Sequence, residues 1–149
     1  MKSKTVANVC RLAQLKDLDD INILFHSAIR GSNAFSRRQE IVYRRILQEE
    51  FVNLFVIEKD EYVVGSCHCA IIPTLAFDGR PYAMLNHFLI DPLNRRQGLA
   101  TELLQFAIDF CKRNGCYQIC VAVDQVYDWQ INLMAKFGFK VHAGMYVYS

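Results

Sequence analysis

The chain alternates between two patterns of apolar residues. Apolar side chains recur at every third or fourth position in residues 18–28 and 99–113, which predicts helices with one buried face. Other segments are rich in β-branched and aromatic residues and are bounded by turn-forming residues, which predicts strands. The expected strands cover residues 6–12, 54–58, 62–72, 82–90, 117–123 and 139–148.

Two further helices are expected. Ser36 and, three residues later, Gln39 form a capping-box pattern, which predicts a helix that ends near residue 50. Its apolar face is thin, so we expect this helix to be partly exposed. Residues 129–137 predict a short helix that Gly138 ends. Asp17 precedes the first helix and is in position to cap it.

The elements follow one another in the order β-α-α-β-β-β-α-β-α-β. Short turns between neighbouring strands predict antiparallel hairpins in the first half of the chain. The strand–helix–strand segment at residues 82–123 predicts a right-handed parallel crossover. We therefore expect an α+β fold, with helices flanking a mixed, mostly antiparallel sheet. Neither the Gly-x-Gly-x-x-Gly pattern of dinucleotide-binding domains nor a P-loop is present in the sequence.

The composition is that of an ordinary globular domain. Of the 149 residues, 52% are hydrophobic and 21% are charged, so a single domain with a sizeable core fits residues 1–149. A formal net charge of +2 is too small to predict binding to nucleic acid or to a membrane surface. No stretch resembles a signal peptide or a membrane span, so a cytoplasmic location is the default expectation.

The six cysteines are expected to be reduced thiols in that location. Cys67, His68 and Cys69 are close enough in sequence to suggest a zinc site. Strand alternation, however, points His68 away from the two cysteines. Buried thiols are therefore the better interpretation, and no metal is expected.

The segment between the strand at residues 82–90 and the long helix carries the main candidate chemistry. A helix begins with N–H groups that have no partner within the helix, and with the positive end of its dipole. Gly98 and Ala100 keep this first turn free of bulk, while Arg95 and Arg96 add positive charge. The segment therefore predicts a binding site for a pyrophosphate. The alternative is that Gly98 only permits close packing between the helix and a strand.

These motifs resemble those of the GNAT superfamily of N-acetyltransferases. The central motif of that family is an apolar strand, Asp-Pro, and then Arg/Gln-x-x-Gly-x-Gly/Ala at the start of a helix. Residues 88–92 read Phe-Leu-Ile-Asp-Pro, and residues 95–100 read Arg-Arg-Gln-Gly-Leu-Ala. Residues 9–13 resemble the usual opening of the family, and residues 133–139 resemble its closing motif. The order of strands and helices is similar to that of the family over essentially the whole chain.

The resemblance implies a GNAT-type sheet of about six to seven strands, with a splay between the two central strands. It also implies that acetyl-CoA, or another acyl-CoA, is the acyl donor. The pyrophosphate would bind at the loop and the pantetheine arm along the strand before it, while Tyr127 stands where the family often has a CoA-contacting asparagine. The implied donor-binding residues are Phe88, Leu89, Ile90, Arg95, Arg96, Gln97, Gly98, Leu99, Ala100, Thr101 and Tyr127.

Positions that often carry the family's proton chemistry differ in this chain. Met134 stands where a tyrosine often protonates the departing CoA thiolate, and Ala122 stands where a carboxylate is common. A thiol pKa of about 8–9 makes the thiolate a fair leaving group without a dedicated acid. The base that deprotonates the amine must then come from elsewhere. The candidates for proton transfer are His87, Asp124, Tyr127 and Tyr146, each of which also has an ordinary structural explanation.

Two functions are compatible with this pattern. We favour an enzyme that transfers an acetyl group from acetyl-CoA directly to a primary amine of a small molecule or peptide. The alternative is an acetyl-CoA-binding module that has lost catalysis and acts as a sensor or interaction partner. The resemblance implies that residues 30–37 and the last strands shape the acceptor site. No nucleic-acid or membrane partner is expected, and both a monomer and a homodimer are compatible with the sequence.

Overall fold

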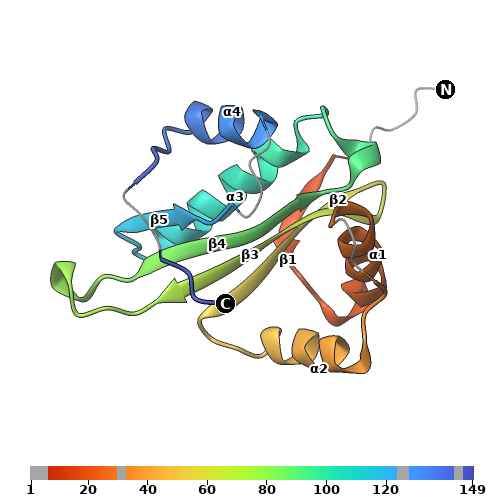
Figure 1. Cartoon of the computed structure of the whole chain (residues 1–149), viewed down its shortest axis with the longest axis horizontal. Helices are drawn as coiled ribbons and strands as arrows, with labels where there is room; N and C mark the ends of the chain where they lie inside the picture. Colours follow the sequence, from red (N-terminus) through yellow and green to blue (C-terminus); the bar gives the residue numbers. More distant parts are fainter. Residues whose placement is uncertain (1–6, 30–32, 124–127, 143–145) are drawn as a thin grey trace.

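The computed structural model of the protein describes residues 7–29, 33–123, 128–142 and 146–149. These residues form a sheet with helices on both faces (Figure 1). Short 3-10 helices lie in the connections: η1 (Leu15–Asp17), η2 (Phe77–Gly79) and η3 (Pro92–Asn94). The strands and α-helices are β1 (Val9–Leu12), α1 (Leu18–Ala28), α2 (Arg37–Ile46), β2 (Val52–Lys59), β3 (Tyr62–Ile72), β4 (Tyr82–Ile90), α3 (Leu99–Arg113), β5 (Gln118–Val121) and α4 (Asp128–Lys136).

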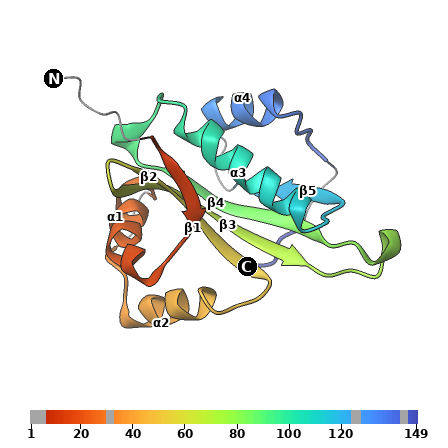
Figure 2. The ribbon, with the colours of Figure 1, turned by 180° about the vertical axis from the view of Figure 1, so that it is seen from behind.

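The strands of the described residues form one mixed sheet in the order β1-β2-β3-β4-β5. The first four strands are antiparallel to their neighbours. β5 runs parallel to β4, because α3 carries the chain back across one face of the sheet between them (Figure 2). The parallel crossover predicted at residues 82–123 is therefore confirmed.

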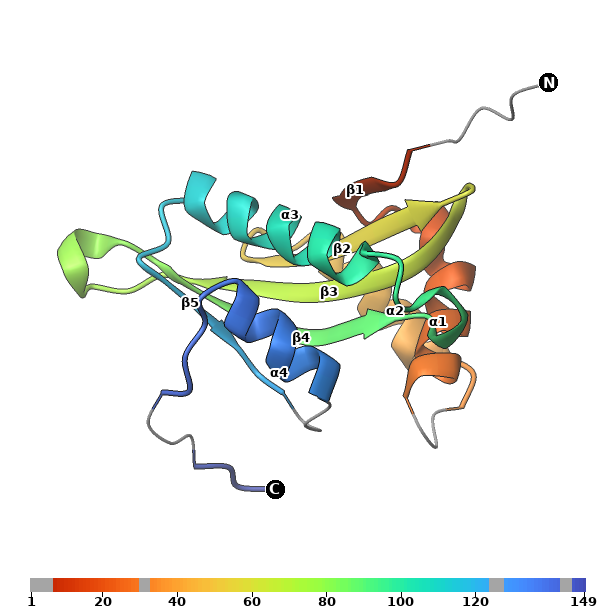
Figure 3. The same cartoon turned by 90° about the horizontal axis from the view of Figure 1, so that it is seen from above.

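Each face of the sheet packs against its own helices. On one face, α3 and α4 cover a core that includes Phe55, Leu85 and Leu103, each 0% exposed. On the other face, α1 and α2 cover a smaller core that includes Ile21 and Tyr43. The view from above shows α1 and α2 together near one end of the sheet, with α3 running along it (Figure 3). Neighbouring residues on β4 therefore point toward different sets of helices.

β4 separates from β5 part-way along its length. The two strands pair over four residues each, and the last contact is a hydrogen bond of 2.9 Å from the Ala122 N–H to the Leu85 carbonyl. His87 has a φ of +47°, and the register between β3 and β4 shifts around Cys67, which marks a β-bulge in β4. Beyond Leu85, the edge of β4 has no strand partner on the β5 side within the described residues.

Most of the predicted elements are confirmed, but the closing strand is not. β3, β4 and α3 have the predicted bounds, whereas α2 ends at Ile46 rather than near residue 50. The strand predicted at residues 139–148 is wrong for the described part of that segment, none of which lies in a strand. Val141 and Val147 are 105% and 80% exposed, so their alternation reflects no packing on a sheet face. The described sheet accordingly has five strands rather than six or seven.

Asp17 has a different role from the predicted one. It occupies the N-cap position of α1, but its carboxylate forms no capping hydrogen bond. The buried carboxylate instead accepts hydrogen bonds from Arg11 at 2.7 and 2.8 Å and from the Gln14 N–H at 2.7 Å. Arg11 also pairs with Glu58 of β2. This network joins β1, the start of α1 and β2.

Candidate functional site

The connection from β4 to α3 begins with a local hydrogen-bond network. The Asp91 carboxylate accepts hydrogen bonds from the Leu93 N–H at 3.1 Å and from the Asn94 side-chain amide at 3.2 Å. The Asn94 N–H donates to the Asp91 carbonyl at 2.9 Å. Pro92 suits the first position of this helical turn because it lacks an N–H group. The network fixes the direction in which the chain leaves β4 and enters the loop at residues 95–98.

Gly98 occupies the N-cap position of α3 with a φ of +79°. Glycine adopts this left-handed conformation freely, whereas other residues pay about 1–2 kcal/mol for it. A Cβ added at Gly98 would meet no atom within 4 Å. The alternative that this glycine permits close packing of the helix against a strand is therefore wrong. The left-handed backbone conformation explains why glycine occupies this position. The absence of a side chain also leaves the surface in front of the first turn of α3 uncovered.

The N-terminus of α3 presents amide groups that lack intrahelical partners. The first hydrogen bond of the helix runs from the Glu102 N–H to the Gly98 carbonyl at 3.1 Å. The N–H groups of Leu99, Ala100 and Thr101 precede this bond and have no partner within the helix. The side chain of Leu99 is buried and anchors this turn in the core, while Gly98 lies at the surface. Anchored amides at the positive end of a helix are suited to binding an anion.

Positively charged side chains surround this turn. Arg95 and Arg96 are exposed, and neither forms an ion pair in the part of the chain that the structure describes. Lys59, at the end of β2, donates a hydrogen bond to the side-chain oxygen of Gln97. The guanidinium carbon of Arg95 lies 5.9 Å from the ring centre of Trp129, a cation–π contact. Arg95 thereby connects the loop to α4.

The edge of β4 leads from this loop into the sheet. Phe88 and Ile90 are buried in the core beneath α3 and α4, and Leu89 packs toward the core beneath α1. On the β5 side these residues therefore offer backbone N–H and C=O groups, which have no strand partner among the described residues. A ligand that carries amide groups can pair with such an edge as an added strand does.

The four candidates for proton transfer fall in different parts of the molecule. His87 is exposed at the bulge of β4, and its ring centre lies 6.2 Å from that of Phe25 on α1. Tyr146 is fully exposed near the C-terminus. Asp124 and Tyr127 lie outside the described residues. Of the four, the structure thus places His87 beside the open edge of β4.

Two polar residues that are not among the four candidates for proton transfer lie near His87. His68 on β3 is directly opposite Asn86 on β4 in the antiparallel ladder. The side-chain oxygen of Asn86 is buried and accepts no hydrogen bond within the described residues. Burial, together with the nearby charge of His87, lowers the pKa of His68. The sequence signal for this group is the alternation at residues 67–69, which puts His68 on the face opposite the two cysteines.

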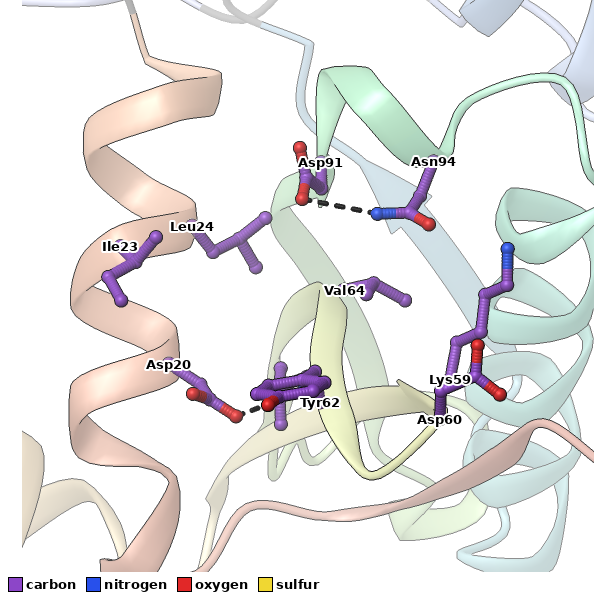
Figure 4. Close-up of a pocket in the computed structure, with 10 residues that line it drawn as sticks. Asp20, Ile23, Leu24, Lys59, Asp60, Tyr62, Val64, Asp91 and Asn94 are labelled. Carbon is purple, nitrogen blue, oxygen red and sulfur yellow. Dashed lines mark hydrogen bonds between the residues drawn. The ribbon is translucent and has the colours of Figure 1, made fainter. Parts of the chain in front are cut away.

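A surface pocket of about 400 Å³ lies beside the loop but contains none of the predicted donor-binding residues (Figure 4). It is bounded by α1, the β2–β3 hairpin and η3. Asp20, Asp60 and Asp91 line it together with Lys59. Asp20 accepts a hydrogen bond from the Val63 N–H at 3.1 Å, and Asp91 belongs to the network of η3. An acidic lining of this kind repels a pyrophosphate, so the amides of α3 remain the candidate anion site.

The prediction that Cys67 and Cys69 are buried thiols is confirmed. Cys67 and Cys69 are buried free thiols on the α3 side of the sheet, and the Cys69 sulfur lies 3.8 Å from the Cys111 sulfur. Burial raises the pKa of the Cys67 thiol, so it stays protonated. Among the described residues, no group of three or more His, Cys, Asp or Glu side chains could hold a metal ion. No helix in this part of the chain is both long and apolar enough to cross a membrane.

Comparison with known proteins gives consistent matches. The model of the Acetyltransferase (GNAT) family matches residues 16–139. An uncharacterized N-acetyltransferase of Methanocaldococcus jannaschii is 26% identical over an alignment of 121 residues, and the match covers 77% of this chain and 51% of that protein. The chain thus spans about half the length of this curated relative.

Two solved structures illustrate the similarity of fold. A transcriptional regulator from Bacillus halodurans C-125 has a TM-score of 0.86 and 21% identity, over 96% of this chain and 100% of that chain. An aminoglycoside N-acetyltransferase in complex with CoA has a TM-score of 0.80 and 16% identity, over 96% of this chain and 94% of that chain. At these identities the two structures support the fold alone.

Proposed function

Because the chain belongs to the acetyltransferase (GNAT) family, we propose that residues 1–149 form one domain that transfers an acetyl group from acetyl-CoA to a primary amine. The observation that carries this proposal is the meeting of two free backbone surfaces, the amides at the start of α3 and the open edge of β4. The first surface suits a pyrophosphate, and the second suits the amides of a pantetheine arm. Acetyl-CoA carries both groups.

The donor-binding residues act mainly through their backbone in this proposal. Amides between Arg96 and Thr101 hold the pyrophosphate, and the β4 edge from Phe88 to Ile90 pairs with the pantetheine arm. Exposed charges attract an anion without fixing its geometry, so Arg95 and Arg96 contribute affinity and association rate. Tyr127 is retained as a CoA contact on the strength of the family resemblance.

We propose direct attack of the amine in a ternary complex. The lone pair of the neutral amine attacks the thioester carbonyl, the carbon–sulfur bond breaks, and the CoA thiolate takes up a proton. Met134 packs partly buried against the core of α3 and α4 and has no proton to give. Departure of the thiolate therefore depends on its low basicity. His87, Asp124, Tyr127 and Tyr146 are the candidates from the sequence for proton transfer.

The acceptor is proposed to be a small molecule or a peptide with a primary amine. Phe25 lies beside His87 on the α1 side, and its ring centre is 5.5 Å from that of Phe35. This aromatic surface favours an acceptor that carries apolar groups next to its amine. One structural neighbour is an aminoglycoside N-acetyltransferase, so an aminoglycoside belongs in any acceptor panel.

Release of CoA thiol from acetyl-CoA tests the proposal. The panel consists of sisomicin, phenethylamine and a peptide that begins with alanine, each compared with an amine-free reaction. We expect thiol release above the amine-free rate with at least one amine, together with acetylation of that amine by mass spectrometry. Failure to bind acetyl-CoA in calorimetry would contradict the proposal outright.

A non-catalytic acetyl-CoA-binding module is the second candidate. Met134 at the usual tyrosine position favours it, and one structural neighbour is a transcriptional regulator. We prefer the enzyme, because loss of one acid–base contribution costs about 10²–10⁴-fold in rate and leaves positioning of the reactants in place. Tight binding of acetyl-CoA without turnover on any amine would favour the module instead.

A further inference from the structure

A compact polar group lies at the point where β4 leaves β5. It consists of His68 on β3 and of Asn86 and His87 on β4. His68 and Asn86 are directly opposite in the antiparallel ladder, an arrangement that separates Cβ atoms by about 5 Å. Leu85, immediately before Asn86, accepts the last hydrogen bond between β4 and β5. The polar group therefore lies where the open edge of β4 begins.

This group contains a buried polar atom that has no partner within the described residues. The side-chain oxygen of Asn86 accepts no hydrogen bond there, and neither does the buried hydroxyl of Ser66, two residues before His68. Buried polar atoms are nearly always hydrogen-bonded, and leaving one unpaired costs about 1–3 kcal/mol. An N–H donor on a bound molecule would satisfy the Asn86 oxygen.

The polar group is accessible from the face of the sheet that α1 covers in part. His68 and Asn86 are only partly buried. Ala70 and Met84, the next opposed pair on the same face, are also partly buried, so this part of the face keeps some exposure to solvent. A molecule can thus approach His68 from this face while the donor occupies the edge of β4.

Building on the acetyl transfer proposed above, we propose that His68 is the base that takes the proton of the acceptor amine, while the Asn86 oxygen holds that amine. In this arrangement the pyrophosphate lies at the start of α3, and the pantetheine arm runs back along Ile90, Leu89 and Phe88. The thioester then lies near the point where β4 leaves β5. The acceptor nitrogen must meet the thioester at that point. His68 stands one strand away from it.

The proton and the acyl group move in one balanced sequence. The acceptor enters as an ammonium ion, R–NH3+, and donates one N–H to the Asn86 oxygen. One proton passes to an imidazole nitrogen of His68, and the lone pair left on the amine attacks the thioester carbonyl carbon. The carbon–sulfur bond breaks with its electron pair on sulfur, and a second amine proton goes to that thiolate. The products are R–NH–CO–CH3, the CoA thiol and a protonated His68 that returns its proton to water.

The surroundings of His68 favour its neutral form. Burial and the charge of His87 lower the pKa of His68, so the imidazole is free to accept a proton at neutral pH. The residue opposite it on β2 is the apolar Leu54, and the one opposite it on β4 is the uncharged Asn86. Among the described residues, His87 is the titratable group that acts on His68.

The pH dependence of kcat/KM for the amine tests this role, using whichever panel amine turns over. In the wild type, kcat/KM should be flat between the pKa of His68 and that of the amine, because the ammonium ion is bound and deprotonated on the protein. In His68→Gln, only free amine from solution can react. Its kcat/KM should fall about 10²–10⁴-fold near neutral pH and rise about tenfold per pH unit toward the pKa of the amine.

Two further variants separate this role from a structural one. Asn86→Leu removes an unpaired oxygen and keeps the volume, so it should fold, raise KM for the amine and leave the flat profile unchanged. His26→Gln, at an exposed position on α1, is the matched control and should behave as wild type. CoA affinity should be the same in all of these proteins, because the donor contacts are backbone groups elsewhere.

A wild-type value of kcat/KM with a flat profile in His68→Gln would overturn the inference while leaving acetyl transfer established. An unchanged amine KM in Asn86→Leu would also overturn it, and that result does not depend on the folding of the His68 variant. Absence of turnover in the wild type would instead overturn the proposed function on which the inference rests.

Discussion

At the scale of single residues, Gly98 is the residue on which the proposed donor site depends most directly. Alanine at this position must adopt a φ near +79°, which should lower the free energy of unfolding by about 1–2 kcal/mol. The added methyl group would also point into the bare surface in front of the amides. We expect Gly98→Ala to weaken CoA binding at least about tenfold, measured by calorimetry, which corresponds to about 1.4 kcal/mol.

Gly79→Ala is the matched control for this variant. Gly79 has a φ of +72° and, like Gly98, no atom within 4 Å of an added Cβ. It lies in η2, in the hairpin that projects from the far end of the sheet (Figure 1). Chemical denaturation should show a similar loss of stability in both variants, while CoA affinity falls only in Gly98→Ala. Equal CoA affinity in the two variants would contradict the proposal that the β4–α3 loop binds CoA.

Asp17 should make stability depend on pH. Burial alone would raise the pKa of its carboxyl group, but hydrogen bonds from Arg11 and from the Gln14 N–H outweigh burial and lower it. The stabilisation is therefore fully present above the unfolded-state value of about 4 and is lost as the pH falls through the lower folded-state pKa. Asp17→Asn should lose about 2 kcal/mol at pH 7, because it removes one of the two carboxylates that pair with the partly buried Arg11, and Glu58 remains.

Denaturation between pH 2 and pH 7 checks this expectation. The difference in unfolding free energy between wild type and Asp17→Asn should shrink as the pH falls below about 4. Asp19→Asn, at an exposed position in the same first turn of α1, should show no such difference at any pH. A gap between wild type and Asp17→Asn that stays constant over the whole range would rule out the ion pair as its source.

At the scale of elements, the β4–α3 loop and α4 are joined through Trp129. It is the only tryptophan of the chain, and its ring lies 5.9 Å from the Arg95 guanidinium carbon and 6.5 Å from the ring centre of Phe88. Binding of a pyrophosphate should draw Arg95 away from the ring and change the tryptophan fluorescence. Arg95→Gln should reduce the amplitude of this change. An amplitude unaffected by the substitution would show that the signal does not pass through Arg95.

Local elements could largely be predicted from the sequence, because their signals are local. β3, β4 and α3 carry long, regular patterns bounded by turn residues, and their predicted bounds hold. The closing strand carries the same alternation, but a strand also needs a partner edge, which the pattern cannot supply. The bulge at His87 likewise depends on the register between two strands and is invisible in the composition of either strand.

The candidate site was predictable to a similar extent. The candidate anion site follows from one loop, since glycine and basic residues before a helix favour the binding of an anion. Asp17 was placed correctly at the start of α1. Its carboxylate pairs with Arg11 of β1 instead of capping the helix, and the sequence pattern does not predict that contact. His68 and Asn86 lie on separate strands, so their pairing depends on the register of the sheet and cannot be predicted from a local sequence pattern.

At the scale of the whole molecule, the sheet separates the proposed sites of the two substrates. The groups proposed to bind the donor lie at the start of α3 and along the free edge of β4. His68 points to the opposite face from Cys67 and Cys69, which lie on the α3 side, and His87 contacts Phe25 of α1 on that opposite face. The two regions meet where β4 leaves β5. In this account, the bulge and the early end of β5 create the opening through which an amine and a thioester reach each other.

Amide chemical-shift mapping with acetyl-CoA tests the central claim most directly. The account predicts that titration of the 15N-labelled protein shifts the amides between Arg96 and Thr101 and those of Phe88, Leu89 and Ile90. The amides of α2 and η2 should not move. Shifts centred instead on the acidic pocket at Asp20, Tyr62 and Asp91, with the start of α3 unchanged, would contradict the assignment of the donor site.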